Sequence, residues 1–267
     1  MMSPELLFWY GLLLKMAMTA TIVVAASVAV ERSGPFIGAL IAALPTAASA
    51  AYIILALEHP PAFIAASAVA SAAANAAVAV FALGYAALAQ RHGIVLSITA
   101  ATLIWFAAAA GLRLVDWTPA SALALNAAVF AVTVPASARY RRDVLPRDAV
   151  GRTRYDIPLR ALTAALVVAV VTTASHRIGS FASGVFAVFP IVMASFVVIL
   201  HPRVGGKAAG AVLAHAQPPL IGLGLGFLAL HYLVAPVGVW FAYAGGLAVA
   251  MAWSGLLWRL RRLRMRV

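Results

Sequence analysis

Long apolar runs separated by short polar or basic stretches make up nearly the whole chain. Most runs reach the ~17–25 residues that a helix needs to cross a bilayer, so the pattern predicts an all-α, polytopic membrane protein. We expect about nine transmembrane spans. Their approximate limits are 6–30, 35–57, 62–89, 93–112, 119–138, 158–175, 178–200, 207–233 and 236–258.

Composition agrees with this pattern. Hydrophobic residues make up 65% of the 267 positions, and the mean hydropathy is +1.02. Because no stretch is polar enough for a separate soluble domain, we expect residues 1–267 to form one membrane domain. Alanine dominates the apolar positions, and residues 222–226 read GLGLG. Such small residues let membrane helices approach closely.

Rare residues of the first four spans recur at a fixed distance in the last four. The matched pairs are Gly34/Gly179, Phe36/Phe181 and Pro45/Pro190 at an offset of 145, then His59/His201, Pro60/Pro202, Asn75/Gln217, Gly84/Gly226 and Tyr85/Phe227 at an offset of 142. We therefore expect one repeat over 6–113, a linking helix and basic loop over 114–157, a second repeat over 158–258, and a tail over 259–267. A shift of five spans, an odd number, predicts that the second repeat is inverted relative to the first.

Polar residues and prolines interrupt spans 3 and 8 near their middles. Span 3 carries Asn75, and span 8 carries His215, Gln217 and the pair Pro218–Pro219. Proline removes a backbone donor and clashes with the preceding turn. The sequence therefore predicts that span 8 is broken or sharply kinked at the prolines and that spans 3 and 8 are both broken helices, whose freed carbonyls must face protein or a wet cavity.

These interruptions suggest a binding site. Asn75 and Gln217 are repeat mates, and a carboxamide both donates and accepts hydrogen bonds; the alternative is that they hold helices together. We include Pro218 in the candidate site as the point of the break. His215 either carries a coupling proton or bonds to a carbonyl that the prolines leave free.

Four further positions are candidates for the site. Thr46 and Ser49 follow Pro45, and Ser195 follows Pro190. Their hydroxyls contact a solute or else re-satisfy backbone freed by the prolines. Lys15 is either buried in span 1, where a charge indicates function, or reaches the membrane surface with its long side chain.

Charge predicts topology. The formal net charge is +12, but sixteen of the nineteen Lys and Arg residues fall on one side of the predicted bilayer. This distribution favours the positive-inside rule and contact with lipid over binding of nucleic acid. We expect a multi-pass protein of the inner (plasma) membrane, with the N-terminus outside and the C-terminus in the cytoplasm.

The sequence offers little for metal or enzyme chemistry. It has no cysteine, and all seven carboxylates fall in loops or at span ends. We find no paired catalytic groups, no metal-ligand cluster in a span and no phosphate-binding loop. We therefore expect no cofactor, no metal and no enzymatic activity.

The span number, the outside N-terminus, the inverted repeat and the polar positions Asn75 and Gln217 resemble the bile-acid symporter and auxin-carrier type of transporter. That resemblance implies two inverted repeats whose broken helices cross at a substrate site, with Asn75 and Gln217 at the crossing. The two-glycine proline loop and the acidic sodium ligands of bile-acid symporters are absent from this sequence.

We interpret the chain as a secondary transporter or exporter of a small anionic or polar organic solute, bound between spans 3 and 8 and moved by alternating access. Half-helix N-termini at the expected breaks would favour an anion. Two alternatives stay open, a lipid translocase or channel-like pore and a non-catalytic membrane subunit. The oligomeric state also stays open, with a homodimer as one alternative.

The topology is testable by cysteine labelling, because the chain has no native cysteine. A cysteine at position 148, in the basic loop, should react with a membrane-impermeant reagent only after the cells are opened. A cysteine at position 59 should react in intact cells. Labelling of position 148 from outside would overturn both the orientation and the inversion.

Overall fold

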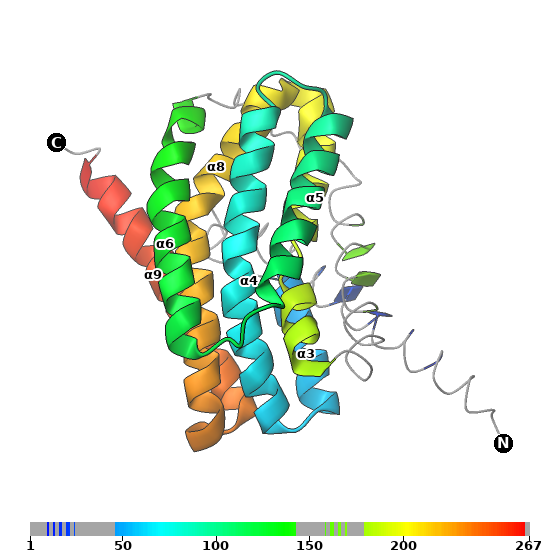
Figure 1. Ribbon diagram of the computed structural model, residues 1–267, viewed down its shortest axis with the longest axis vertical. Helices are drawn as coiled ribbons and strands as arrows, with labels where there is room; N and C mark the ends of the chain where they lie inside the picture. The colour runs from blue at the N-terminus through cyan, green and yellow to red at the C-terminus, as the bar shows by residue number, and fades with distance from the viewer. Residues whose placement is uncertain are drawn as a thin grey trace.

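The computed structural model describes residues 46–142 and 179–264, together with scattered helical positions between 10 and 24 and between 158 and 169. All the regular elements in these parts of the chain are helices (Figure 1). They are α3 (Thr46–Glu58), α4 (Pro61–Leu88), α5 (Ile94–Leu112), α6 (Pro119–Ala138), the 3₁₀ turn η1 (Arg139–Arg142), α8 (Ile191–Val237) and α9 (Val239–Arg264). A short helical segment, 179–187, precedes α8.

Proline, glycine and hydroxyl residues mark the helix ends. Pro61 opens α4 at a position whose N–H would have no helical partner. Thr118 and Ser121 form a reciprocal capping box at the start of α6. Gly238, with φ 80°, ends α8. These local signals separate the long apolar helices from one another.

Among the described residues, five helical stretches are long and apolar enough to cross a membrane. The architecture is that of a helical, multi-pass membrane protein. The predicted spans 62–89, 93–112, 119–138 and 236–258 overlap α4, α5, α6 and α9, and the predicted spans 178–200 and 207–233 both fall within Gly179–Val237.

The remaining predicted spans are only partly covered. α3, with 13 residues, is the described end of the predicted span 35–57. Most of the predicted spans 6–30 and 158–175 lies outside the described residues. The total of nine spans and the inverted repeat therefore stay predictions.

The helix breaks predicted in spans 3 and 8 are wrong. α4 is one continuous helix through Asn75. α8 keeps helical backbone angles through Pro218 and Pro219, and its non-helical residue is Gly205, with φ 83° and ψ 162°. Glycine adopts this conformation without a steric penalty. The interruption thus lies between the predicted spans 7 and 8 and divides α8 into two arms.

α4 is the centre of the described bundle. Residues 67–79 are all buried, as expected of a helix that is surrounded on every side. α5 and α6 flank α4, and the second arm of α8 packs against it in the antiparallel direction (Figure 1). A methyl group on Gly206 would collide with the Ala89 carbonyl, and one on Gly210 would lie 3.2 Å from the Ala86 carbonyl. The small residues therefore set how closely these helices approach.

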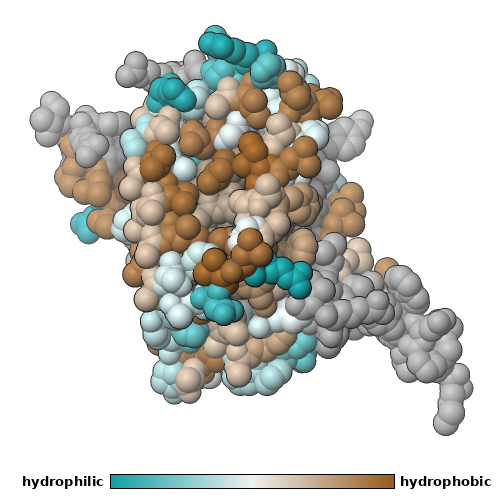
Figure 2. Space-filling model, in the orientation of Figure 1, coloured by the Kyte–Doolittle hydropathy of each residue, from teal (hydrophilic) through white to brown (hydrophobic). Residues whose placement is uncertain are grey.

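The second arm of α8 also packs closely on α9. A methyl group on Gly222 would lie 2.6 Å from Trp253, and one on Gly226 would lie 2.6 Å from the Gly246 carbonyl. This contact agrees with the helix-packing role expected from the GLGLG sequence. On the face that Figure 2 shows, mainly apolar residues cover the middle, and hydrophilic residues gather at the upper end.

Substitution of Gly226 tests this packing. Gly226→Ala should destabilise the protein by about 1–3 kcal/mol, the usual cost of overpacking, because the Gly246 backbone cannot yield without separating α8 from α9. Gly255→Ala on α9 is the matched control, since a methyl group there meets open space. Thermal unfolding of both variants in detergent gives the comparison, and equal melting temperatures would contradict the close contact.

Candidate functional site

Three carboxamide side chains lie in the centre of the bundle: Asn75 of α4, Asn126 of α6 and Gln217 of α8. We call this group the carboxamide layer. Asn75 and Gln217 are both 0% exposed, and Asn126 is 8% exposed. Such complete burial requires that the polar atoms find partners within the protein.

Asn75 connects three helices. Its Nδ2 donates to Asn126 Oδ1 at 2.9 Å and to the Leu220 carbonyl of α8 at 2.8 Å. Asn126 Nδ2 donates to the carbonyls of Ala72, at 2.6 Å, and Ala122, at 2.8 Å. The pair of asparagines thereby joins α6 and α8 to the central helix.

Gln217 makes the return connection from α8 to α4. Its Nε2 donates to the Ala79 carbonyl at 2.7 Å. Ala79 lies one turn beyond Asn75 on α4, just as Leu220 lies one turn beyond Gln217 on α8. Asn75 and Gln217, which the sequence relates as repeat mates, therefore lie in one layer. Asn75 bonds from α4 to α8, and Gln217 bonds from α8 to α4.

Within the part of the chain that the structure describes, two oxygens of the carboxamide layer have no hydrogen-bond partner. Asn75 Oδ1 and Gln217 Oε1 are buried without a hydrogen bond. A buried acceptor left unpaired costs roughly 1–3 kcal/mol. Gly224 closes the layer on the α8 side, where a methyl group would lie 2.9 Å from Asn75 Nδ2 and 3.0 Å from Asn126 Oδ1. The layer is closed to solvent and yet incompletely hydrogen-bonded.

The proline pair beside the layer is held in helical form by side-chain donors. Pro218 lacks the N–H that would bond to the Ala214 carbonyl four residues earlier. Arg141 of η1 replaces that donor, with its Nε 3.1 Å from the Ala214 oxygen. Trp253 Nε1 of α9 donates to the Pro218 carbonyl at 2.8 Å. The bond from Arg141 satisfies the carbonyl that Pro218 leaves free, so the helix does not have to open at that residue.

His215 does not join the carboxamide layer. It is exposed, whereas Gln217, two positions later, is buried. Two residues so spaced are rotated by about 200° around a helix and so point to nearly opposite sides. Proton coupling through His215 stays a prediction. Pro218, by contrast, lies partly buried next to Gln217.

No described hydrogen bond joins Ser195 to the layer. Ser195 Oγ donates to the Val192 carbonyl of its own helix at 2.8 Å, which fits the backbone-satisfying alternative. The side chain of Thr46 and the whole of Lys15 lie outside the described residues.

Ser49 lines a groove between α3, α8 and α9. Its hydroxyl is hydrogen-bonded to Tyr243. Tyr52, on the same groove, is hydrogen-bonded through its hydroxyl to Ser71 at 2.8 Å. Because these hydroxyls are already paired and the other walls are apolar, the groove presents a mainly apolar surface next to the layer.

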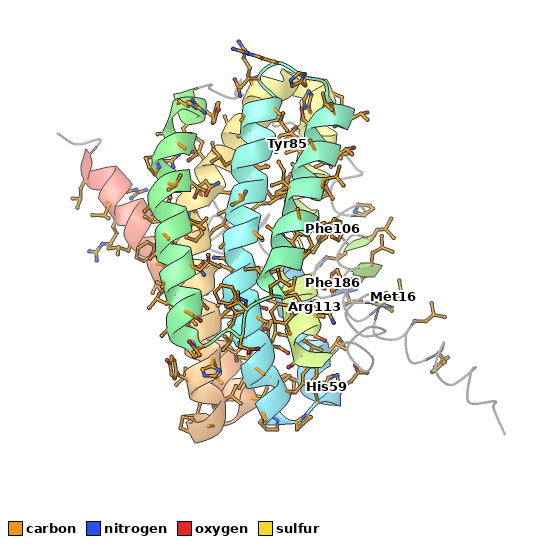
Figure 3. All side chains as sticks on the ribbon, viewed as in Figure 1. Met16, His59, Tyr85, Phe106, Arg113 and Phe186 are labelled. Carbon is orange, nitrogen blue, oxygen red and sulfur yellow. The ribbon has the colours of Figure 1, made fainter. Side chains whose placement is uncertain are left out.

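A further polar contact joins the first arm of α8 to α4 near the bend. Tyr85 Oη lies 2.7 Å from His201 Nδ1 on the first arm of α8, close to Gly205. Tyr85 and His59 lie at opposite ends of α4 in Figure 3. The contact between Tyr85 and His201 therefore lies far along α4 from Asn75. It anchors the bend of α8 and does not belong to the carboxamide layer.

Sequence reasoning missed Asn126 and Arg141. Asn126 lies inside the linking span 5, which the repeat leaves out, and its only sequence signal is an amide in the middle of an apolar run. Arg141 is one of several arginines of a basic loop and has no distinguishing local pattern.

Comparison with protein-family models, with characterised proteins and with solved structures finds no match for this chain. The class, a helical multi-pass membrane protein, therefore rests on the chain itself.

The link between Arg141 and Pro218 can be tested by a double-mutant cycle. Arg141→Gln should destabilise the protein by about 1–3 kcal/mol, because the Ala214 carbonyl loses its donor. In a Pro218→Ala background, residue 218 regains an N–H for that carbonyl, so the same substitution should cost about 1 kcal/mol less.

Arg139→Gln is the control for this cycle, since Arg139 is exposed and stacks on Tyr140. Arg139→Gln should change the stability by the same amount with Pro218 and with Pro218→Ala. Chemical or thermal unfolding in detergent measures the six proteins: the wild type, Arg141→Gln and Arg139→Gln, each in both backgrounds. An equal cost of Arg141→Gln with and without Pro218 would show that the arginine does not replace the missing donor.

Proposed function

We propose that the protein is a secondary membrane transporter for a small polar organic solute, which binds in the carboxamide layer between α4 and α8. The observation that carries this proposal is the pair of buried, unpartnered oxygens Asn75 Oδ1 and Gln217 Oε1. A layer that serves only to hold helices would be more stable with those oxygens paired or replaced by apolar groups.

Contacts related by the sequence repeat support the inverted arrangement. The Asn75–Leu220 bond and the Gln217–Ala79 bond run in opposite directions between antiparallel helices. Inverted copies of one span would pack against each other in this antiparallel manner.

A second pair of contacts follows the same offset. A methyl group on Gly84 would lie 3.3 Å from Ile104 of α5. The offset of 142 carries these two positions onto Gly226 and Gly246, where α8 approaches α9. The α4–α5 and α8–α9 pairs therefore use equivalent positions, as two copies of one unit would.

In the proposed mechanism, the described state is closed around the layer. Movement of one repeat against the other would open the layer first to one side of the membrane and then to the other, which is alternating access. We place the protein in the inner (plasma) membrane with the N-terminus outside and the C-terminus cytoplasmic, following the distribution of Arg and Lys. In this proposal the protein resembles the bile-acid symporter type only in the order of its spans and in the inversion of its repeats.

The structural role of the layer is the second candidate function. Asn75 and Gln217 are fully buried and donate to backbone carbonyls, as residues that join helices in a non-catalytic membrane subunit would. Interhelical hydrogen bonds of this kind contribute only ~0.6 kcal/mol on average in membranes. The two functions therefore predict different results when the carboxamides are removed.

Substitution of the carboxamides separates these functions. In proteoliposomes that take up a solute identified by a thermal-shift screen, Asn75→Ala and Gln217→Ala should each weaken binding about ten- to hundredfold, the equivalent of about 1–3 kcal/mol. Both proteins should remain folded, because each loses only a small part of the total stability.

Gln90→Ala is the matched control. It removes a carboxamide that lies just after the end of α4 and donates to the Ala86 carbonyl, four residues earlier, at 2.9 Å. This variant should bind and transport like the wild type. Wild-type transport by both Asn75→Ala and Gln217→Ala would refute the site and leave the structural role.

A further inference from the structure

We infer that the solute of the carboxamide layer is a neutral molecule that donates hydrogen bonds, and that Asn75 Oδ1 and Gln217 Oε1 accept them. This inference rests on the proposed function and narrows its substrate class. It depends on three properties of the layer: the orientation of each amide, the balance of donors and acceptors, and the charges nearby.

Backbone carbonyls determine the orientation of each amide. The nitrogen of Asn75 faces the Leu220 carbonyl, that of Asn126 faces the Ala72 and Ala122 carbonyls, and that of Gln217 faces the Ala79 carbonyl. A carbonyl can only accept a hydrogen bond. Turning any of these amides over would place oxygen against oxygen, so the unpartnered atoms of Asn75 and Gln217 are oxygens.

Most N–H groups of the layer already donate a hydrogen bond, whereas two of its three amide oxygens accept none from the described residues. Asn75 Nδ2 donates twice, and Asn126 Nδ2 also donates twice. An amide nitrogen has two N–H groups, so both are saturated. The oxygens Asn75 Oδ1 and Gln217 Oε1 accept no bond. A molecule that completes this layer must therefore bring O–H or N–H groups.

An anion would meet the wrong partners here. Its oxygens would face two further acceptor oxygens, and the saturated nitrogens of Asn75 and Asn126 could not bond to it. Gln217 Nε2, which donates once, would offer it a single N–H group. Arg141 contacts α8 at Ala214, three residues before Gln217, and its guanidinium donates to the carbonyls of Ala214 and Val134 and to the Ser137 hydroxyl. A solute anion would have to displace those bonds.

A cationic solute would lack a counter-charge. Within the part of the chain that the structure describes, the two carboxylates are Glu58, at the end of α3, and Asp116, between α5 and α6. Neither comes from the middle of a helix that forms the layer. An unpaired charge in an apolar bundle is strongly unfavourable. The charge balance thus favours neutral donors such as amides, ureas and polyols.

Matched pairs of probes test this class on the purified full-length protein. Each neutral compound is compared with the acid of similar shape: acetamide with acetate, nicotinamide with nicotinate, and glycerol with glycerate, within a wider panel of amides, ureas and polyols. We expect neutral members to raise the melting temperature and their acid partners to leave it unchanged. Direct titration of the best neutral probe then gives its Kd.

Gln217→Met is the decisive variant, because it keeps the side-chain length and removes the acceptor oxygen, together with the nitrogen that bonds to Ala79. It should weaken binding of the best neutral probe by at least about tenfold. Without a probe it should melt at the same temperature as the wild type or higher, since removing an unpartnered buried oxygen offsets the loss of one interhelical bond. Gln90→Ala, which alters an amide outside the layer, should change neither value.

Each other outcome overturns a definite claim. Stabilisation by acids alone, lost in Gln217→Met, would refute the neutral class while the layer remained the binding site. Stabilisation that Gln217→Met leaves intact, or none from any probe, would refute the site and with it the proposed function. A clearly lowered melting temperature of probe-free Gln217→Met would show that Gln217 holds the helices together.

Discussion

The arrangement around α8 depends on one constraint: a backbone carbonyl that loses its helical N–H inside an apolar bundle needs another donor. Pro218 leaves the Ala214 carbonyl in this condition, and the Arg141 guanidinium supplies the bond from a different element. Because the requirement is met from outside the helix, the helix does not have to open. The second arm of α8 can then stay helical past the prolines and place Gln217 and Leu220 opposite α4.

Close approach of the helices is the second condition for the carboxamide layer. An asparagine side chain is short, and Asn75 reaches the Leu220 carbonyl only because glycine and alanine let α8 lie against α4. Gly224 has the same role for the Asn75–Asn126 pair, since a larger residue would press on both amides. The small residues and the amides therefore act together: the former set the distance at which the latter can bond.

Sequence reasoning recovered what apolar length and small-residue spacing determine. The positions of α4, α5, α6 and α9 followed from runs that only a membrane helix accommodates. It placed the helix interruption wrongly, because the effect of a proline depends on a donor that lies far away in the sequence. Arg141 and Ala214 are 73 residues apart. No local pattern connects them.

The same limit applies to the candidate site. The offset that pairs Asn75 with Gln217 was visible in the sequence, and the structure brings both into one layer. Asn126 belongs to no repeat, so its contact with Asn75 could not be read from the sequence. His215 is the opposite case, since helical spacing alone would have placed it away from the face of Gln217. Its inclusion followed from residue type, which carries no information on direction.

A layer built from carboxamides is suited to opening and closing because its bonds are weak and can be exchanged. Each interhelical bond of this kind contributes only ~0.6 kcal/mol on average, so losing the two that join α4 to α8 requires little free energy. A solute that offers donors would occupy oxygens that have no partner in the closed state, and this gain could offset the loss. The bond from Arg141 to Ala214 does not belong to the layer and can persist while the layer opens. The turn at Pro218 would then stay helical, and the second arm of α8 would move as a rigid element.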